Sequence, residues 1–111
     1  MVGMQHLFMA AALLVAALAS PLPSAEPGKT VHIRDYKFTP ASLTVDRGDR
    51  VTFVNDDDDA HTVTADDGAW DSEGLPHGAH WTRVFDKAGK VAYHCTVHPL
   101  MRGTVVVRAP Q

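Results

Sequence analysis

Residues 91–108 read VAYHCTVHPLMRGTVVVR, which is two apolar runs joined by a short loop that carries Cys, His and Met side chains. The β-branched and aromatic residues of both runs predict two neighbouring strands, over residues 91–95 and 103–108. Because successive side chains of a strand point to opposite faces, Cys95 and His94 lie on opposite sides. We expect Cys95 to face the core and His94 to face outward.

Turn residues divide the preceding chain into further short β-prone runs. These runs are bounded by Pro, Gly, Asp or Asn and cover residues 31–38, 42–45, 50–54, 61–64 and 80–85. Residues 66–79 are rich in Gly, Asp and Pro and predict an irregular loop. Short strands at regular spacing, with no segment of helical periodicity, predict an all-β fold, a β-sandwich of about seven to eight strands.

The first 25 residues differ from the rest because they carry no Lys, Arg, Asp or Glu. Their apolar run, Leu7–Ala19, is shorter than a membrane span and is typical of a signal peptide. We therefore expect a signal peptide over residues 1–25, a single domain over residues 26–111, and a periplasmic or otherwise exported protein. The scarcity of positive charge before Leu7 leaves open an uncleaved membrane anchor.

The charge and the cysteine content limit the kinds of partner that the protein can bind. The chain has a formal net charge of −3 and no basic stripe, so we expect no nucleic-acid partner. Its single cysteine, Cys95, cannot form a disulfide within the chain. A lone thiol in an oxidising compartment is prone to intermolecular oxidation unless it is buried or ligated, which suggests that Cys95 binds something.

Cys95, His98 and Met101 follow one another with two residues in each interval, at the end of a predicted strand. A short loop can therefore place a thiolate, an imidazole and a thioether around one ion. Structural zinc sites draw four ligands from Cys and His, whereas a thiolate together with a thioether favours copper. The trigonal His2Cys arrangement with a weak axial Met is the type 1 copper site, and it requires a second histidine.

His61 is the best candidate for that second histidine. It follows the turn NDDDD and opens a predicted strand, a position from which its side chain can meet the 95–101 loop. His77 and His80 lie in or beside the irregular loop, are less constrained, and stay open. His32 has apolar neighbours that are expected to take the core face of the first strand, and His6 lies in the expected signal peptide.

The segments YHCTVHPLMRGTVVV, HTVTADDG and FTPASLTVDRGDRVTFVND resemble the cupredoxins, and the resemblance extends over residues 31–108. The amicyanin-like group is the nearest because its Cys-to-Met loop is equally short; plastocyanin and pseudoazurin have a longer interval between His and Met. The resemblance implies a Greek-key β-sandwich. It also implies one type 1 copper per chain, with ligands at His61, Cys95, His98 and Met101.

The same resemblance implies one-electron transfer to or from protein partners, and we expect a monomer. The expected partners are redox proteins, a donor dehydrogenase and/or a cytochrome c-type acceptor. Pro99 and Leu100 flank His98, and we expect these partners to dock at the small apolar patch that the two residues form. Four protein ligands leave no open coordination position, which argues against an enzyme. The alternative function is a periplasmic copper-binding or chaperone protein without a carrier role.

Two positions depart from the family pattern. Val97 stands where amicyanin-like loops usually have proline, and its N–H is a candidate donor to the Cys95 sulfur; the alternative is that Val97 only packs. Thr62 stands where the family often has an asparagine that ties the two ligand segments together, and its hydroxyl is a candidate for the same tie. The acidic run Asp56–Asp59 lacks the ligand spacing of a calcium loop and predicts a solvated turn.

Overall fold

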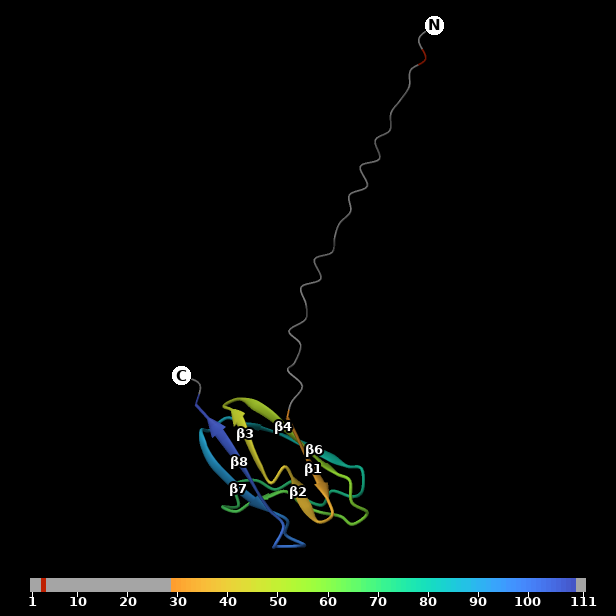
Figure 1. The fold of residues 1–111 in the computed structure, drawn as a ribbon, viewed down its shortest axis with the longest axis vertical. Helices are drawn as coiled ribbons and strands as arrows, with labels where there is room; N and C mark the ends of the chain where they lie inside the picture. The colour runs from red at the N-terminus through yellow and green to blue at the C-terminus, as the bar shows by residue number, and fades with distance from the viewer. Residues whose placement is uncertain (1–2, 4–28, 110–111) are drawn as a thin grey trace.

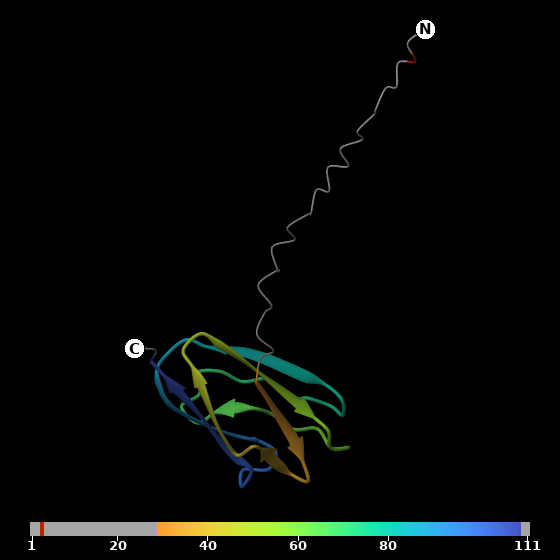
Figure 2. The same ribbon diagram turned by 45° about the horizontal axis from the view of Figure 1, so that its top comes forward.

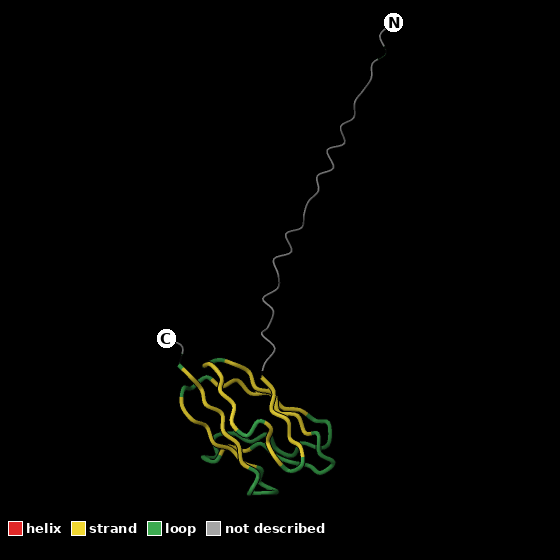
Figure 3. The backbone as a smooth tube through the Cα atoms, viewed as in Figure 1, coloured by secondary structure: helices red, strands yellow, loops and turns green. Residues whose placement is uncertain are grey.

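The computed structural model describes Gly3 and residues 29–109. The expected signal peptide therefore lies, apart from Gly3, outside the described residues, and so do the two ends of the expected domain. All regular structure in the described part consists of strands (Figure 3). No helix found among those residues is long and apolar enough to cross a membrane.

Two four-stranded sheets form a sandwich (Figures 1 and 2). The first has the order β2-β1-β4-β6, with β1 Lys29–Arg34, β2 Lys37–Thr39, β4 Asp49–Asn55 and β6 His80–Phe85. The second has the order β3-β8-β7-β5, with β3 Ser42–Asp46, β5 Thr64–Ala65, β7 Gly89–His94 and β8 Arg102–Arg108. The parallel pairs β1–β4 and β3–β8 accompany antiparallel ones. The predicted all-β sandwich is thereby confirmed.

Alternation along the strands fills the space between the sheets with apolar side chains. Tyr93 of β7 lies at the centre, where its ring meets Phe38 edge-on at 4.8 Å and Phe53 at 5.4 Å between centroids. Fully buried aliphatic side chains of both sheets complete this core, and they are Val31, Ile33, Val45, Val51 and Val105. Burial of each such side chain contributes roughly 1.5–3 kcal/mol.

Two predicted strands differ from the observed ones. The run over residues 31–38 is divided by a turn at Asp35 and Tyr36, whose φ angles of 50° and 59° are both left-handed. Neither residue is glycine, so the sequence carries only a weak signal for that conformation, from the aspartate. The run over residues 61–64 becomes the two-residue strand β5, and His61 instead forms an isolated bridge with Leu75.

Three connecting segments meet at one end of the sandwich. These are the β1–β2 turn, the segment that follows β4, and the β7–β8 loop, which extends from that end in Figure 1. Hydrogen bonds join the first two segments, since Asp57 accepts the N–H groups of Asp35 and Tyr36. The ring of Tyr36 also packs against that of His98 in the third segment. This end holds the residues that the sequence singled out.

Candidate metal centre

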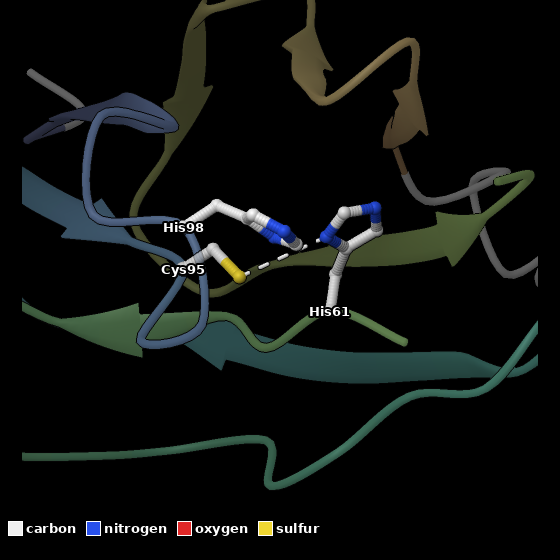
Figure 4. Close-up of side chains that lie close together, drawn as sticks. All are labelled: His61, Cys95 and His98. Atoms are coloured by element: carbon white, nitrogen blue, oxygen red, sulfur yellow. Dashed lines mark hydrogen bonds between the residues drawn. The ribbon is translucent and has the colours of Figure 1, made fainter. Parts of the chain in front are cut away.

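His61, Cys95 and His98 converge at this end of the sandwich (Figure 4). One donor atom from each residue lies within 4.8 Å of the other two, and within the described residues this is the only such group of His, Cys, Asp or Glu. His61 comes from the segment after β4, whereas Cys95 and His98 come from the β7–β8 loop. The structure thus brings together three of the four residues singled out as ligands, from two distant parts of the sequence.

Burial, backbone hydrogen bonds and contacts at both ring nitrogens fix the position of His61. Its side chain has no exposed surface, and its backbone pairs with Leu75 through hydrogen bonds of 3.1 and 2.7 Å. The ring nitrogen Nε2 lies 2.9 Å from Oδ2 of Asp57. The other nitrogen, Nδ1, lies 3.8 Å from Sγ of Cys95. His61 therefore has one ring nitrogen engaged by the protein and one directed at the thiol.

Cys95 is a free, fully buried thiol directly after β7. Its backbone N–H donates to the carbonyl of Met101 at 3.1 Å, and the N–H of Met101 donates to the carbonyl of His98 at 2.9 Å. These two bonds close the loop on itself, so its three candidate ligands are fixed relative to one another. The core-facing prediction for Cys95 is confirmed.

The N–H that reaches the Cys95 sulfur comes from Thr62, at 3.4 Å, and the candidate bond from Val97 is absent among the described residues. The alternative, that Val97 only packs, gains no support from its burial either, because 59% of this residue is exposed. The loop folds back through the Cys95–Met101 bond. That path presents Val97 to solvent.

Thr62 ties the two ligand segments together, which was one of the open possibilities. Its hydroxyl accepts the backbone N–H of Thr96 at 2.9 Å and lies 3.1 Å from the Thr96 hydroxyl. A further hydroxyl, from Thr64, lies 2.9 Å away. Threonine thus makes the link between segments that the family often makes with asparagine.

Met101 lies at the other end of the same loop, just before β8, and is only 5% exposed. Together with Tyr36 and Leu100, it lines a shallow surface groove of about 240 Å³. A buried thioether at this point of the loop fits a weak axial donor. Its sequence interval from His98 places it beside the cluster.

Asp57 and Tyr36 are two residues beside the site that the sequence did not reveal. The expectation of a solvated turn over the acidic run is wrong for Asp57, whose side chain is 13% exposed and contacts His61. Burial by itself raises the pKa of the Asp57 carboxyl, but hydrogen bonds from Tyr36, Asp35 and His61 outweigh it and hold that pKa below its ordinary value. The sequence does hold one signal for Asp57, which is its position four residues before His61. Metal-binding histidines commonly donate a hydrogen bond to a carboxylate.

Tyr36 covers the site from the β1–β2 turn. Its ring meets those of His61 and His98 edge-on, with centroids 5.3 and 5.0 Å away. Its hydroxyl donates to Asp59, and this hydrogen bond to a carboxylate raises the pKa of the Tyr36 hydroxyl above its ordinary value. No periodic signal marks Tyr36, because its position depends on the left-handed turn.

The remaining histidines of the described part lie outside the cluster. His94 is on the outer face of β7, as predicted, and contacts Asp66 at 2.5 Å. His32 contacts Asp56 at 2.7 Å, and His77 lies 2.9 Å from the carbonyl of Asp57. His80 is exposed at the start of β6. His61 is therefore the histidine that joins the loop, as the sequence favoured.

The residues present fit a bound metal ion. Nδ1 of His98 is buried and has no hydrogen-bond partner, although a buried polar nitrogen is normally paired. Nδ1 of His61 lies 3.8 Å from the free Cys95 thiol, and one donor atom from each of His61, Cys95 and His98 lies within 4.8 Å of the other two. An ion between these atoms would satisfy all three. The combination of imidazole, thiol and nearby thioether is the donor set of type 1 copper, and the four residues are arranged as such a site.

Comparison with known proteins agrees with this geometry. The family description "Cupredoxin-like domain" matches residues 6–107. This chain is a cupredoxin. The cupredoxin is 33% identical to amicyanin from Paracoccus denitrificans over 96 residues, which cover 79% of this chain and 73% of the relative. It is also 33% identical to amicyanin-alpha from Methylorubrum extorquens over 106 residues, covering 90% and 89% of the two chains.

The fold comparison leads to the same group. The structure of the Cu(I) form of an amicyanin variant superposes on this cupredoxin with a TM-score of 0.69 at 31% identity, covering 73% of this chain and 82% of the other. The amicyanin-like resemblance is therefore confirmed. With its site geometry, membership of this group makes the chain a copper electron-transfer protein.

Proposed function

We propose that this protein is an exported carrier of single electrons between redox proteins, and that its copper is held by His61, Cys95, His98 and Met101. The observation that carries the proposal is the convergence of unlike donors within 4.8 Å. One donor is a buried free thiol and another is a buried nitrogen without a hydrogen-bond partner. Such a soft, asymmetric set fits copper better than structural zinc.

The surroundings of the ligands suggest a division of roles. Copper, when bound, would supply the one-electron couple between Cu(I) and Cu(II). His61 and Cys95 have no exposed surface, so they would exclude water and keep the donor geometry fixed. His98 is only half-buried and would bring its ring edge towards a partner. Thr62 donates its N–H to Sγ and would reduce the electron density on the thiolate.

An apolar surface surrounds His98 and supports docking of a redox partner there. Four large apolar side chains of the described residues are exposed, namely Tyr36, Val84, Val97 and Leu100. Three of them flank the site: Val97 precedes His98, Leu100 belongs to the same loop and is 95% exposed, and Tyr36 packs on the His98 ring. A small patch suffices because electron-transfer contacts are brief and small.

A visible spectrum tests the copper assignment. We expect the copper-loaded protein to be intensely blue, to bleach with a mild reductant, and to lose the colour in Cys95→Ser. His77→Asn is the matched control, because His77 is an exposed histidine outside the cluster, and it should stay blue. A colourless loaded protein, or a blue Cys95→Ser variant, would show the assignment to be wrong.

The carrier role is tested by electron self-exchange between reduced and oxidised copies, measured by NMR line broadening. We expect Leu100→Glu to slow self-exchange by roughly tenfold, because like charges then face each other at the contact. Val84→Glu is the control, since Val84 is 43% exposed on β6, away from the site. Equal slowing in both variants would contradict docking around His98.

The chaperone alternative predicts exchangeable copper. The full burial of His61 and Cys95 instead supports slow release. We expect copper to resist a Cu(I) chelator for hours in the wild-type protein, and rapid complete transfer would favour the chaperone.

Export rests on the N-terminal sequence and is tested separately. Fractionation of cells that express the full chain, with N-terminal sequencing of the product, should find a periplasmic protein that begins near residue 26. Retention of residue 1 in a membrane fraction would indicate an uncleaved anchor.

A further inference from the structure

Asp57 links the β1–β2 turn to the metal site through one carboxylate. Its Oδ1 accepts the N–H of Asp35 at 2.8 Å, and its Oδ2 accepts the N–H of Tyr36 at 2.9 Å. Oδ2 also lies 2.9 Å from Nε2 of His61. The side chain is 13% exposed, so these protein groups, rather than water, surround it.

The carboxylate determines which nitrogen of His61 carries the proton. An ionised carboxylate can only accept hydrogen bonds, and two backbone N–H groups already point at Asp57. The short contact with Oδ2 therefore requires the proton of His61 on Nε2. Nδ1 keeps its lone pair, and this is the nitrogen that lies 3.8 Å from the Cys95 sulfur.

The same carboxylate holds a turn that is otherwise unfavourable. Asp35 and Tyr36 have φ angles of 50° and 59°, a region that side chains other than glycine seldom adopt. Two consecutive left-handed residues persist only where their surroundings fix them. Asp57 accepts the N–H of both. The turn in turn sets the Tyr36 ring edge-on against His61 and His98.

We propose that Asp57 is a positioning residue for the metal centre: it fixes the tautomer of His61, holds Tyr36 over both histidine rings, and lowers the reduction potential by placing a negative charge on the far side of a ligand. The effect on the potential rests on the proposed copper function. The effects on the His61 tautomer and on the turn do not, because both exist in the metal-free protein.

Asp57→Asn removes the negative charge of residue 57 while it can keep the hydrogen bonds to Tyr36 and His61. The amide oxygen can retain the bonds at Oδ2, to Tyr36 and His61, but the amide nitrogen then faces the N–H of Asp35. We expect the potential of the copper protein to rise, as the oxidised state loses a nearby negative charge. A tenfold change in the ratio of Cu(II) to Cu(I) affinity, which is the size expected for a residue behind a ligand, corresponds to about 59 mV.

Asp58→Asn is the matched control. It makes the same charge change one residue further on, but Asp58 is fully exposed and makes no contact with His61. Screening by solvent should leave the potential nearly unchanged. An Asp57→Asn shift no larger than that of Asp58→Asn, measured by voltammetry on proteins that both remain blue, would overturn the electrostatic part of the proposal.

The tautomer and the turn are read by NMR on the metal-free protein. In the wild type, the ¹⁵N shifts of His61 should report a single Nε2–H form, and Asp57→Ala should give a mixture together with a displaced Tyr36 ring signal. If Asp57→Ala does not fold, the amide of Asp35 in Asp57→Asn serves instead and should exchange with solvent roughly tenfold faster than in the wild type. An unchanged tautomer in Asp57→Ala, or unchanged Asp35 exchange in Asp57→Asn, would overturn the positioning role. A wild-type protein that is not blue would instead count against the copper function alone.

Discussion

The two segments that form the metal site are built differently. The segment with His61 is anchored in the body of the protein. The His61 ring is fully buried, its backbone pairs with Leu75, and its Nε2 contacts the carboxylate of Asp57. The segment with His98 is a loop whose tip is open to solvent, with Leu100 95% exposed. The backbone hydrogen bond between Cys95 and Met101 closes this loop at its base.

This difference suggests that one side of the site keeps the donor geometry rigid and that the other side gives a partner access to a ligand. A carrier that exchanges electrons must keep its donor geometry nearly constant, and it must also let a partner approach a ligand. The buried segment provides the first property and the open loop the second. Thr62 and Cys95 join the two segments, through the bonds of Thr62 to Thr96 and to the Cys95 sulfur. Variants in each segment test this contrast between the anchored segment and the open loop, and they are given in order of decreasing effect.

Truncation of each histidine should affect the metal-free protein unequally. His61→Ala leaves a cavity and an unpaired Asp57 contact, so we expect a loss of about 3 kcal/mol in the free energy of unfolding. His98→Ala, in the half-buried loop, should cost less than about 1 kcal/mol. Urea denaturation of both metal-free variants measures this. Equal losses would mean that the two segments contribute alike to stability.

Gly103→Ala tests how firmly the base of the loop is packed. A Cβ at Gly103 would lie 2.6 Å from Cε2 of Tyr93 and closer still to Cζ and Oη, at the centre of the core. The backbone of β8 cannot withdraw without disturbing the sheet, so we expect a loss of about 2 kcal/mol from overpacking. Gly74→Ala is the control, because a Cβ there meets no atom within 4 Å. A small loss, with the melting temperature as the measure, would indicate a base that yields easily.

Thr62→Val removes the tie between the segments while keeping the shape of the side chain. The Thr96 N–H then loses its acceptor, and we expect a loss of about 1 kcal/mol together with a changed blue absorption band. Thr82→Val is the control. It removes a hydroxyl pair of 2.9 Å with Thr52 on the outer surface, and it should leave the spectrum unaltered. An unaltered spectrum in Thr62→Val would show that the tie does not govern the site.

The weakest expected effect comes from Asp56, which lies on the anchored segment but outside the site. Hydrogen bonds from Arg34 and then His32 hold the pKa of the Asp56 carboxyl below its ordinary value of 3.8. A lowered pKa contributes stability above the unfolded value, and that contribution is lost as the pH falls through the folded value. The small difference in the free energy of unfolding between wild type and Asp56→Asn at pH 5 should therefore vanish as the pH falls through the lowered pKa of the folded protein, as urea denaturation at several pH values can measure. A difference that grows in acid would contradict this assignment.

The all-β class and the candidate ligands follow from local patterns in the sequence. Alternation between apolar and polar residues requires no knowledge of the fold, because it follows from the geometry of a single strand. It placed Cys95 inside and His94 outside correctly. The interval from Cys95 to Met101 is likewise a local property, since one short loop carries its three donors. Selection of His61 needed only its position after a turn.

The groups that surround those ligands come together only when distant segments of the chain pack against one another. In the sequence, Asp57 is one residue of a charged run. It is buried because the β1–β2 turn packs onto it. That turn is left-handed at two residues that carry side chains, a conformation fixed by a distant carboxylate and not by local preference. For the same reason the donor to the Cys95 sulfur is Thr62, 33 residues away in the chain, and not Val97. Contacts between distant segments depend on how the sheets pack, and a linear pattern does not contain that information.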